Sequence, residues 1–129
     1  MKTTVIMNEQ HSLLPSQEDL LKSHFETFDF LRVPDGGWTA QEMREMATSL
    51  EGRNVVFVSP VPVLLAIVSA RAGASRTGNM AEKDGAIGFA GPETHVFVMH
   101  NDHREKKELP NGKVVMTVAR EGWEIVPVA

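Results

Sequence analysis

Residues 3–17 read TTVIMNEQHSLLPSQ and contain the junction that decides the fold. An apolar run ends at Met7, and a cluster of hydrogen-bonding side chains follows at once, from Asn8 to Ser12. A helix then begins, because Ser16 can cap its first turn and apolar residues recur at helical spacing as far as Phe25. A strand that passes through a polar loop into a helix is typical of an open α/β sheet. In such a sheet the carboxyl ends of the strands are where ligands bind.

The same alternation of strand and helix continues along the chain. The pattern predicts a small Rossmann-like α/β domain over residues 1–129, with a mostly parallel sheet and helices on both of its faces. It also predicts a C-terminal antiparallel hairpin at one edge of the sheet, around the Asn-Gly turn at residues 111–112. Residues 74–92 are rich in glycine and small side chains and are expected to form a loop insertion. We expect strands at 3–7, 28–33, 54–58, 95–99 and 123–128, helices at 16–25, 39–50 and 59–71, and the hairpin at 106–118.

Composition narrows the class of protein. With 42% hydrophobic and 23% charged residues, the chain has the composition of an ordinary globular domain. It has no apolar run of membrane-spanning length, no signal-peptide pattern and no cysteine, so we expect a cytoplasmic protein without disulfides or thiolate chemistry. Its net charge of −4 argues against binding to long nucleic acid but permits a small anion in a locally basic pocket.

Three strand-to-loop junctions are expected to meet at one edge of the sheet. They are residues 8–12, 59–62 and 100–106, and two of them lead into a helix whose free amide groups favour an anion. Phosphate is the expected anion, because it can accept hydrogen bonds from several donors at once. The predicted catalytic residues are His11, Arg104 and Lys106, and the predicted ligand-binding residues are Asn8, Gln10, Ser12, Ser59, Pro60, His100 and Asn101.

Each of these residues also has a plainer interpretation. His11 is equally compatible with a solvated loop, Ser59 with a helix cap, and Arg104 and Lys106 with the charged start of an edge hairpin. His100 and His103 look like a metal pair, but side chains three apart in a strand face opposite sides, so no metal is predicted. The sequence has no Walker A, GxGxxG or nucleophile-elbow motif, and no cofactor is expected.

Three segments resemble a known family. They are Asn8-x-x-His11-x-Leu13-x-Pro15-x-Gln17, then Ser59-Pro-Val-Pro-Val-Leu-Leu, and finally Arg104 to Val115 with Gly122-Trp123 near the end. Together they are similar to the small CRISPR-associated Rossmann-like proteins, the stand-alone ring nucleases related to CARF domains. The resemblance extends over most of residues 5–72 and 95–126, and residues 74–92 depart from it as an insertion.

The resemblance implies a homodimer that binds and cleaves cyclic oligoadenylate, the second messenger of type III CRISPR antiviral defence. In that reaction a ribose 2′-hydroxyl attacks the adjacent phosphorus and no metal is needed. His11 would move a proton, while Arg104, Lys106, Asn8, Gln10 and the amides after Ser59 would stabilise the phosphoryl charge.

Other functions remain open from the sequence. The same fold could serve as a non-catalytic sensor or sponge for a cyclic nucleotide. The polar edge could instead belong to an unrelated enzyme that acts on a small phosphate or nucleotide. A structural or partner-binding protein is the third alternative, and it would show a large exposed apolar patch.

Overall fold

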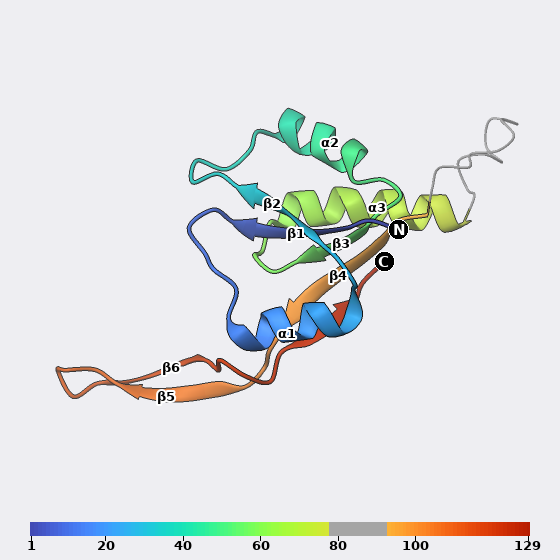
Figure 1. The fold of residues 1–129 in the computed structure, drawn as a ribbon. Coiled ribbons are helices and arrows are strands. Elements are labelled where there is room, and N and C mark those ends of the chain that lie inside the picture. The colour runs from blue at the N-terminus through green and yellow to red at the C-terminus, as the bar shows by residue number, and fades with distance from the viewer. Residues whose placement is uncertain (78–92) are drawn as a thin grey trace, which may run out of the picture.

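The computed structural model describes residues 1–77 and 93–129, and within them a five-stranded sheet stands apart from a two-stranded hairpin (Figure 1). The strand order in the large sheet is β2-β1-β3-β4-β7, with β7 antiparallel to β4 and the other pairs parallel. The predicted α/β class with a mostly parallel sheet is confirmed. The elements are β1 (Thr3–Asn8), α1 (Pro15–His24), β2 (Asp29–Val33), α2 (Ala40–Ser49), β3 (Asn54–Phe57), α3 (Pro62–Thr77), β4 (His95–His100), β5 (Arg104–Glu108), β6 (Val114–Val118) and β7 (Glu124–Pro127).

The central strands are apolar on both sides because both faces of the sheet are covered. Val5 and Ile6 of β1 point to opposite faces, and both are fully buried. In β3, Val55 and Val56 repeat this arrangement and lie beside Thr4 and Val5 in the parallel register. Such continuous apolar runs are what a parallel sheet needs when helices cover both of its faces.

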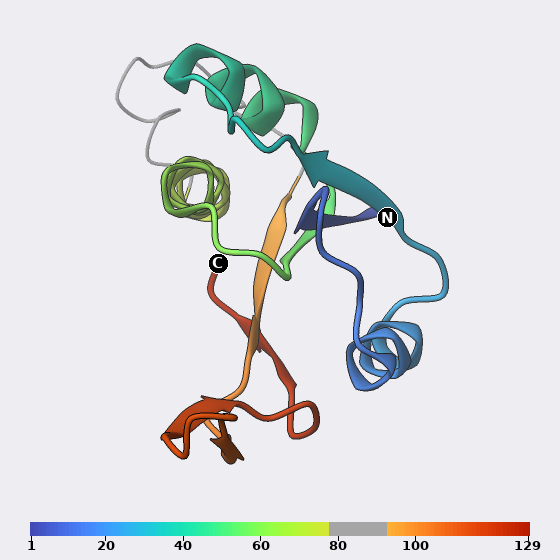
Figure 2. The same ribbon diagram turned by 90° about the vertical axis from the view of Figure 1, so that its left-hand side faces the viewer.

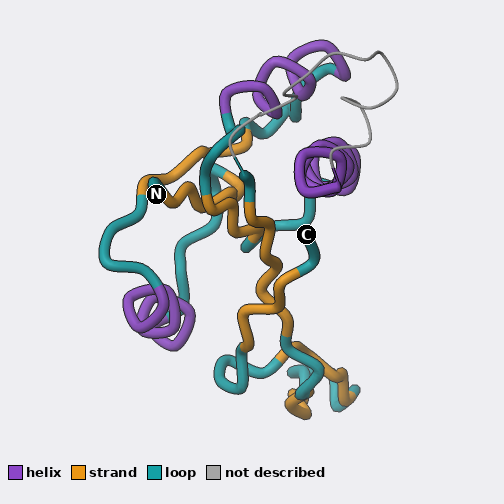
Figure 3. The backbone as a smooth tube through the Cα atoms, turned by 90° about the vertical axis from the view of Figure 1, so that its right-hand side faces the viewer, coloured by secondary structure: helices purple, strands orange, loops and turns teal. Residues whose placement is uncertain are grey.

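The helices divide between the two faces, as predicted. Figures 2 and 3 show α2 and α3 on one side of the sheet and α1 on the other. The face under α2 and α3 carries the larger cluster, which includes Ile6, Val55, Leu64 and Val68. The face under α1 carries the smaller one, built on Val5, Leu21, Val56 and Met99. The loop after β1 therefore leaves the sheet toward one face, and the loops after β2 and β3 leave toward the other.

Helix α2 begins as its sequence predicts. The Thr39 hydroxyl accepts a hydrogen bond from the Glu42 N–H at 3.1 Å, and the Glu42 carboxylate accepts one from the Thr39 N–H at 3.1 Å. This reciprocal capping box satisfies two amide donors that the helix itself leaves without partners.

Thr39→Ala is expected to lower the free energy of unfolding by about 1 kcal/mol, the usual cost of losing an N-cap side chain. Urea titration followed by circular dichroism measures the change. Gln41→Ala, an exposed position in the same helix, is the matched control and should change stability by less than about 0.5 kcal/mol. Equal losses in the two variants would contradict the capping role of Thr39.

Two helix boundaries differ from the prediction. Leu14, not Ser16, precedes the first helical residue of α1, and the buried Gln17 side chain accepts a hydrogen bond from the Leu14 N–H at 3.0 Å. Ser16 is the second residue of the helix, and its hydroxyl donates to the Arg120 carbonyl rather than capping the first turn. Helix α3 runs through Gly73 to Thr77, because Ala72 is fully buried and its packing outweighs the roughly 1 kcal/mol cost of a helical glycine. The rest of the predicted 74–92 loop lies outside the described residues.

The hairpin does not join the edge of the large sheet, so the predicted placement is wrong. The edge beside β4 is occupied by β7, while β5 and β6 pair only with each other in the described part of the chain. The turn type differs too. Gly112 donates its N–H to the Leu109 carbonyl at 2.9 Å and has a φ of +82°, whereas Asn111 has a negative φ. Pro110 sets a negative φ at the second turn position, so the turn is type I with a glycine bulge rather than type I′.

Within the described ranges, no helix combines the length and the apolar character needed to span a membrane.

Candidate functional site

The loops after β1 and β3 leave the sheet toward opposite faces although the two strands are neighbours. The β1 loop leads to α1 on one face, and the β3 loop leads to α3 on the other. In open α/β sheets, ligands bind where the connections of adjacent parallel strands diverge in this way. We call this junction, formed by residues 8–12 and 59–62, the crevice. The predicted residues Asn8, His11, Ser59 and Pro60 all belong to these two loops.

Three of those residues meet in the crevice. The buried Ser59 hydroxyl accepts a hydrogen bond from the Asn8 N–H at 3.0 Å. The Nδ1 atom of His11 lies 3.4 Å from the same hydroxyl oxygen, while the His11 side chain is exposed. Ser59 therefore connects the two strand ends and holds one edge of the imidazole. The other ring nitrogen, Nε2, is left for solvent or a ligand.

The β2 side of the loop is held by a second set of contacts. The Arg32 guanidinium donates to the His11 carbonyl at 2.9 Å, and the Glu9 carboxylate accepts from the Asp35 N–H at 2.9 Å. The predicted ligand-binding residue Gln10 donates through Nε2 to the Asp35 carboxylate at 2.7 Å. Contacts from both neighbouring strands thus fix the loop that carries His11, so the imidazole is positioned before any ligand arrives.

A small hollow of about 100 Å³ opens beside this loop. Nucleotide-sized ligands usually occupy pockets of roughly 300–1,000 Å³. The hollow is large enough for a hydroxyl group or a few waters, so a nucleotide would lie across the sheet edge with one group inserted. The lining residues are Asn8, Gln10, His11, Val33, Pro34 and Asp35.

The chain continues from Ser59, the contact of His11, into the amino terminus of α3 three residues later. Pro62 is its first residue, and Val61 accepts the first helical hydrogen bond, from the Leu65 N–H at 2.9 Å. The N–H groups of Val63 and Leu64 have no acceptor within the helix, because they belong to its first turn. The helix dipole adds partial positive charge at this end, so the position favours an anion.

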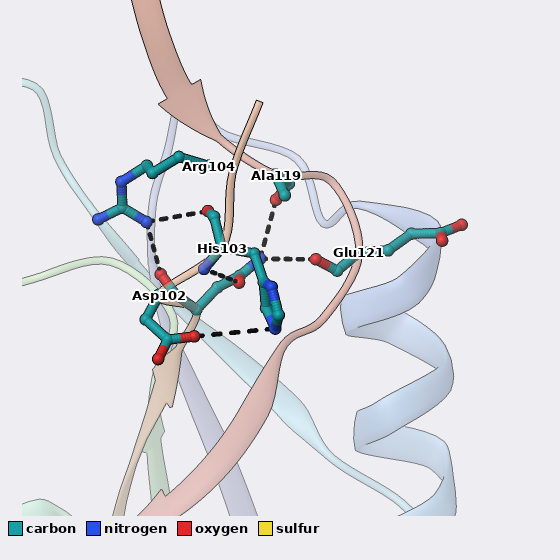
Figure 4. Close-up of polar contacts among 6 residues, drawn as sticks. Asp102, His103, Arg104, Ala119 and Glu121 are labelled. Carbon is teal, nitrogen blue, oxygen red and sulfur yellow. Dashed lines mark hydrogen bonds and ion pairs between the residues drawn. The ribbon is translucent and has the colours of Figure 1, made fainter. Parts of the chain in front are cut away.

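At the third predicted junction, after β4, a network of hydrogen bonds around Asn101 holds two parts of the chain together. The buried Asn101 side chain donates through Nδ2 to the carbonyls of Ala119 and Glu121, at 2.9 and 2.8 Å (Figure 4). Its Oδ1 atom accepts a hydrogen bond from the His103 N–H at 2.9 Å. Asn101 therefore joins the end of β4 to the chain that returns from the hairpin. Its amide group is fully used in this network, and its role in ligand binding stays a prediction.

Arg104 belongs to the same network. Its guanidinium donates to the carbonyls of Asn101 and His103 at 2.9 and 3.0 Å (Figure 4). His103 Nε2 lies 3.8 Å from the Asp102 carboxylate, and its ring leaves no space for a side chain at Gly122, whose φ is +91°. No group of three or more possible metal ligands occurs among the described residues.

The structure thus brings together Asn8, His11 and Ser59 and places Arg104 at the neighbouring strand end. Within residues 1–77 and 93–129, no hydrogen bond or ion pair connects Arg104 with that group. Lys106 lies farther out on the hairpin and is exposed. The remaining predicted residues, Ser12, Pro60 and His100, are exposed around the same end of the sheet.

Sequence reasoning missed Asp35 and Arg32. Asp35 follows β2, the strand beside β1, and it lines the hollow. A signal existed, because an acidic residue just beyond the second strand of a nucleotide-binding sheet often contacts a ribose hydroxyl. Arg32 gave no such signal, since its contact is to a backbone carbonyl across the sheet.

Comparisons of the chain with protein-family models, with curated proteins and with solved structures found no match.

Proposed function

We propose that this chain binds a cyclic oligoadenylate at the crevice between β1 and β3 and cleaves it without a metal ion. The observation that carries the proposal is the His11–Ser59 pair, an exposed imidazole fixed at a strand junction beside a helix amino terminus. The resemblance of the Asn8–Gln17, Ser59–Leu65 and Arg104–Val115 segments to small CRISPR-associated ring nucleases supports the choice of ligand. Membership of that family is part of the proposal.

The two sides of His11 suit different parts of a nucleotide. On one side, the Asp35 carboxylate and the Gln10 amide can exchange hydrogen bonds with a ribose hydroxyl. At the adjoining strand end, the N–H of the exposed Val63 in the first turn of α3 suits a phosphate. A ribose and its 3′-phosphate bridging these sides would place the 2′-hydroxyl and the phosphorus next to the imidazole, which is the alignment that in-line attack requires.

The reaction forms one bond and breaks one bond at phosphorus. The 2′-oxygen attacks, the bond to the 5′-oxygen of the next nucleotide breaks, and the products are a 2′,3′-cyclic phosphate and a free 5′-hydroxyl. A proton must leave the 2′-oxygen and another must reach the 5′-oxygen. His11 would carry out one of these transfers, since an imidazole exchanges protons near neutral pH.

Ser59 accommodates either protonation state of that imidazole. Its oxygen already accepts the Asn8 N–H, and it still has one donor and one acceptor position. The hydroxyl can therefore donate to a neutral Nδ1 or accept a hydrogen from it. The ring can therefore carry out its one proton transfer at Nε2 while Nδ1 keeps its contact with Ser59.

A second function is a cyclic-nucleotide binding protein that does not turn its ligand over. The acidic groups beside the crevice favour it. Glu9 and Asp35, from the loops after β1 and β2, add negative charge that partly offsets the Arg32 guanidinium, which donates to the His11 carbonyl. Neutral donors are sufficient for binding, whereas stabilising charge in a phosphoryl transition state profits from cations.

Incubation with cyclic tetraadenylate and cyclic hexaadenylate in excess EDTA separates the two functions. We expect linear products that end in a 2′,3′-cyclic phosphate, identified by liquid chromatography and mass spectrometry. Recovery of the intact ring together with tight binding by calorimetry would contradict cleavage and establish the binding function. An increase in melting temperature with mononucleotides, but not with either ring, would contradict the proposed ligand class.

A further inference from the structure

The hairpin carries an exposed apolar stripe on one strand. Val114, Met116 and Val118 alternate along β6 and are 59, 58 and 47% exposed. Figure 1 shows the hairpin reaching away from the sheet and helices, so no part of the described body covers this strand. A two-stranded hairpin is marginally stable on its own in water, and it gains most from additional strands.

The free edge of β6 presents backbone groups of the same three residues. The hairpin ladder includes bonds from the Leu109 N–H to the Lys113 carbonyl at 2.7 Å and from the Ala119 N–H to the His103 carbonyl at 3.1 Å. Antiparallel ladders alternate along a strand, so Val114, Met116 and Val118 direct their N–H and C=O groups away from β5. No strand pairs with that edge in the described part of the chain.

The two edges of the hairpin differ in charge. The outer edge of β5 presents Arg104, Lys106 and Glu108. Pairing it with a copy of itself about its centre would put Lys106 opposite Lys106, although it would also put Arg104 opposite Glu108. Charged side chains on an edge are a common protection against strand addition. The β6 edge has no charge within the strand, so it is the edge that is open to a further strand.

We infer that β6 pairs with β6 of a second copy of this chain, antiparallel and centred on Met116. The strand reads VVMTV, so this register places Val114 opposite Val118 of the other copy and Met116 opposite Met116. The three pairs would exchange roughly six backbone hydrogen bonds through groups that otherwise face water. The stripes of both copies then form one apolar strip in the middle of a four-stranded sheet, with the charged β5 strands outside.

The charges at the two ends of β6 also favour a second copy of this chain as the partner. Lys113 precedes β6, and Glu121 follows it after Ala119 and Arg120. The inferred register brings the Lys113 end of one copy to the Arg120–Glu121 end of the other, because the strands run in opposite directions. Lys113 then lies opposite Ala119 with Glu121 beyond it, while Arg120 lies opposite Gly112, which has no charge. Opposite charges at neighbouring cross-strand positions stabilise pairing. The inference does not depend on the proposed enzymatic function.

Cysteine cross-linking tests the register, because the natural chain has no cysteine. In Met116→Cys the two residues face each other about 5.5 Å apart between their Cα atoms, within disulfide range. In Val114→Cys, which is equally exposed, they lie roughly 13 Å apart along the strands and cannot be bridged. We expect Met116→Cys to form covalent dimers under mild oxidation at least about tenfold faster than Val114→Cys. Equal rates would overturn the inference.

Sedimentation velocity across a concentration series provides the second test. The natural chain should sediment as a dimer at high concentration, and Met116→Lys should remain monomeric because it places two ammonium groups on the symmetry axis. Val63→Lys, at a position 51% exposed on α3, is the matched control and should still dimerise. A monomeric natural chain, or a Met116→Lys dimer as stable as the natural one, would overturn the inference. Circular dichroism confirms that each variant is folded.

Discussion

His11→Ala is expected to lower the rate of cyclic oligoadenylate cleavage by about 100-fold or more, the usual contribution of a general acid–base residue. Binding should change far less, because the imidazole is exposed and its one side-chain hydrogen bond is long, at 3.4 Å to Ser59. Single-turnover rates by chromatography and dissociation constants by calorimetry measure the two effects separately. A loss of rate with affinity retained is the signature of a residue that acts on the reaction.

His24→Ala is the matched control for this variant. His24 is an exposed histidine in the last turn of α1, where its Nδ1 atom lies 3.0 Å from the Leu20 carbonyl. It takes part in neither loop of the crevice, so its removal should leave the cleavage rate unchanged. If His11→Ala cleaved as fast as His24→Ala, His11 would have no catalytic role.

Asn101→Leu is expected to lower the free energy of unfolding by about 3 kcal/mol. The substitution removes three hydrogen bonds, each contributing about 1 kcal/mol, and leaves the Ala119 and Glu121 carbonyls and the His103 N–H without their partner. Leucine has nearly the same shape, so packing is largely retained and the loss reports the hydrogen bonds. Urea titration measures the change.

Asn111→Ala serves as the control for this loss. Asn111 is also an asparagine that contacts the backbone, since its Oδ1 atom accepts from the Lys113 N–H at 3.1 Å. It lies in the exposed hairpin turn, where water replaces the lost bond, so we expect a change below about 1 kcal/mol. Similar losses in both variants would mean that the Asn101 network contributes no more than a surface turn.

Local patterns predicted the parts of the fold that depend on neighbouring residues. The capping box at Thr39 and Glu42 places the start of α2, and the apolar run at residues 54–58 identifies a strand buried on both faces. The strand-to-loop junctions also predicted that His11 and Ser59 lie at the same edge of the sheet. Their contact is non-local and was not itself predicted, but it follows from the parallel pairing of β1 and β3.

The errors arise where a distant contact decides the outcome. Helix α1 begins at Pro15 rather than at the predicted Ser16, because the buried Gln17 side chain binds the Leu14 N–H. The Ser16 hydroxyl instead donates to the carbonyl of Arg120, far along the chain. The hairpin does not occupy the predicted position at the sheet edge, because β7 pairs with β4 there. Asn101 has the polar character of a ligand-binding residue, yet it is buried by a chain segment that returns from the hairpin. Of these contacts, the one between Gln17 and Leu14 is local, while Arg120, β7 and the carbonyls of Ala119 and Glu121 lie far along the chain from their partners.

The central claim is that a phosphorylated ligand binds at the crevice between β1 and β3. Nuclear magnetic resonance of the ¹⁵N-labelled chain during titration with cyclic tetraadenylate in EDTA tests it most directly. We predict that the largest amide shifts will occur at Asn8, His11, Val63 and Leu64, on both sides of the imidazole. Shifts confined to the hairpin or to β7, with these amides unchanged, would contradict the account.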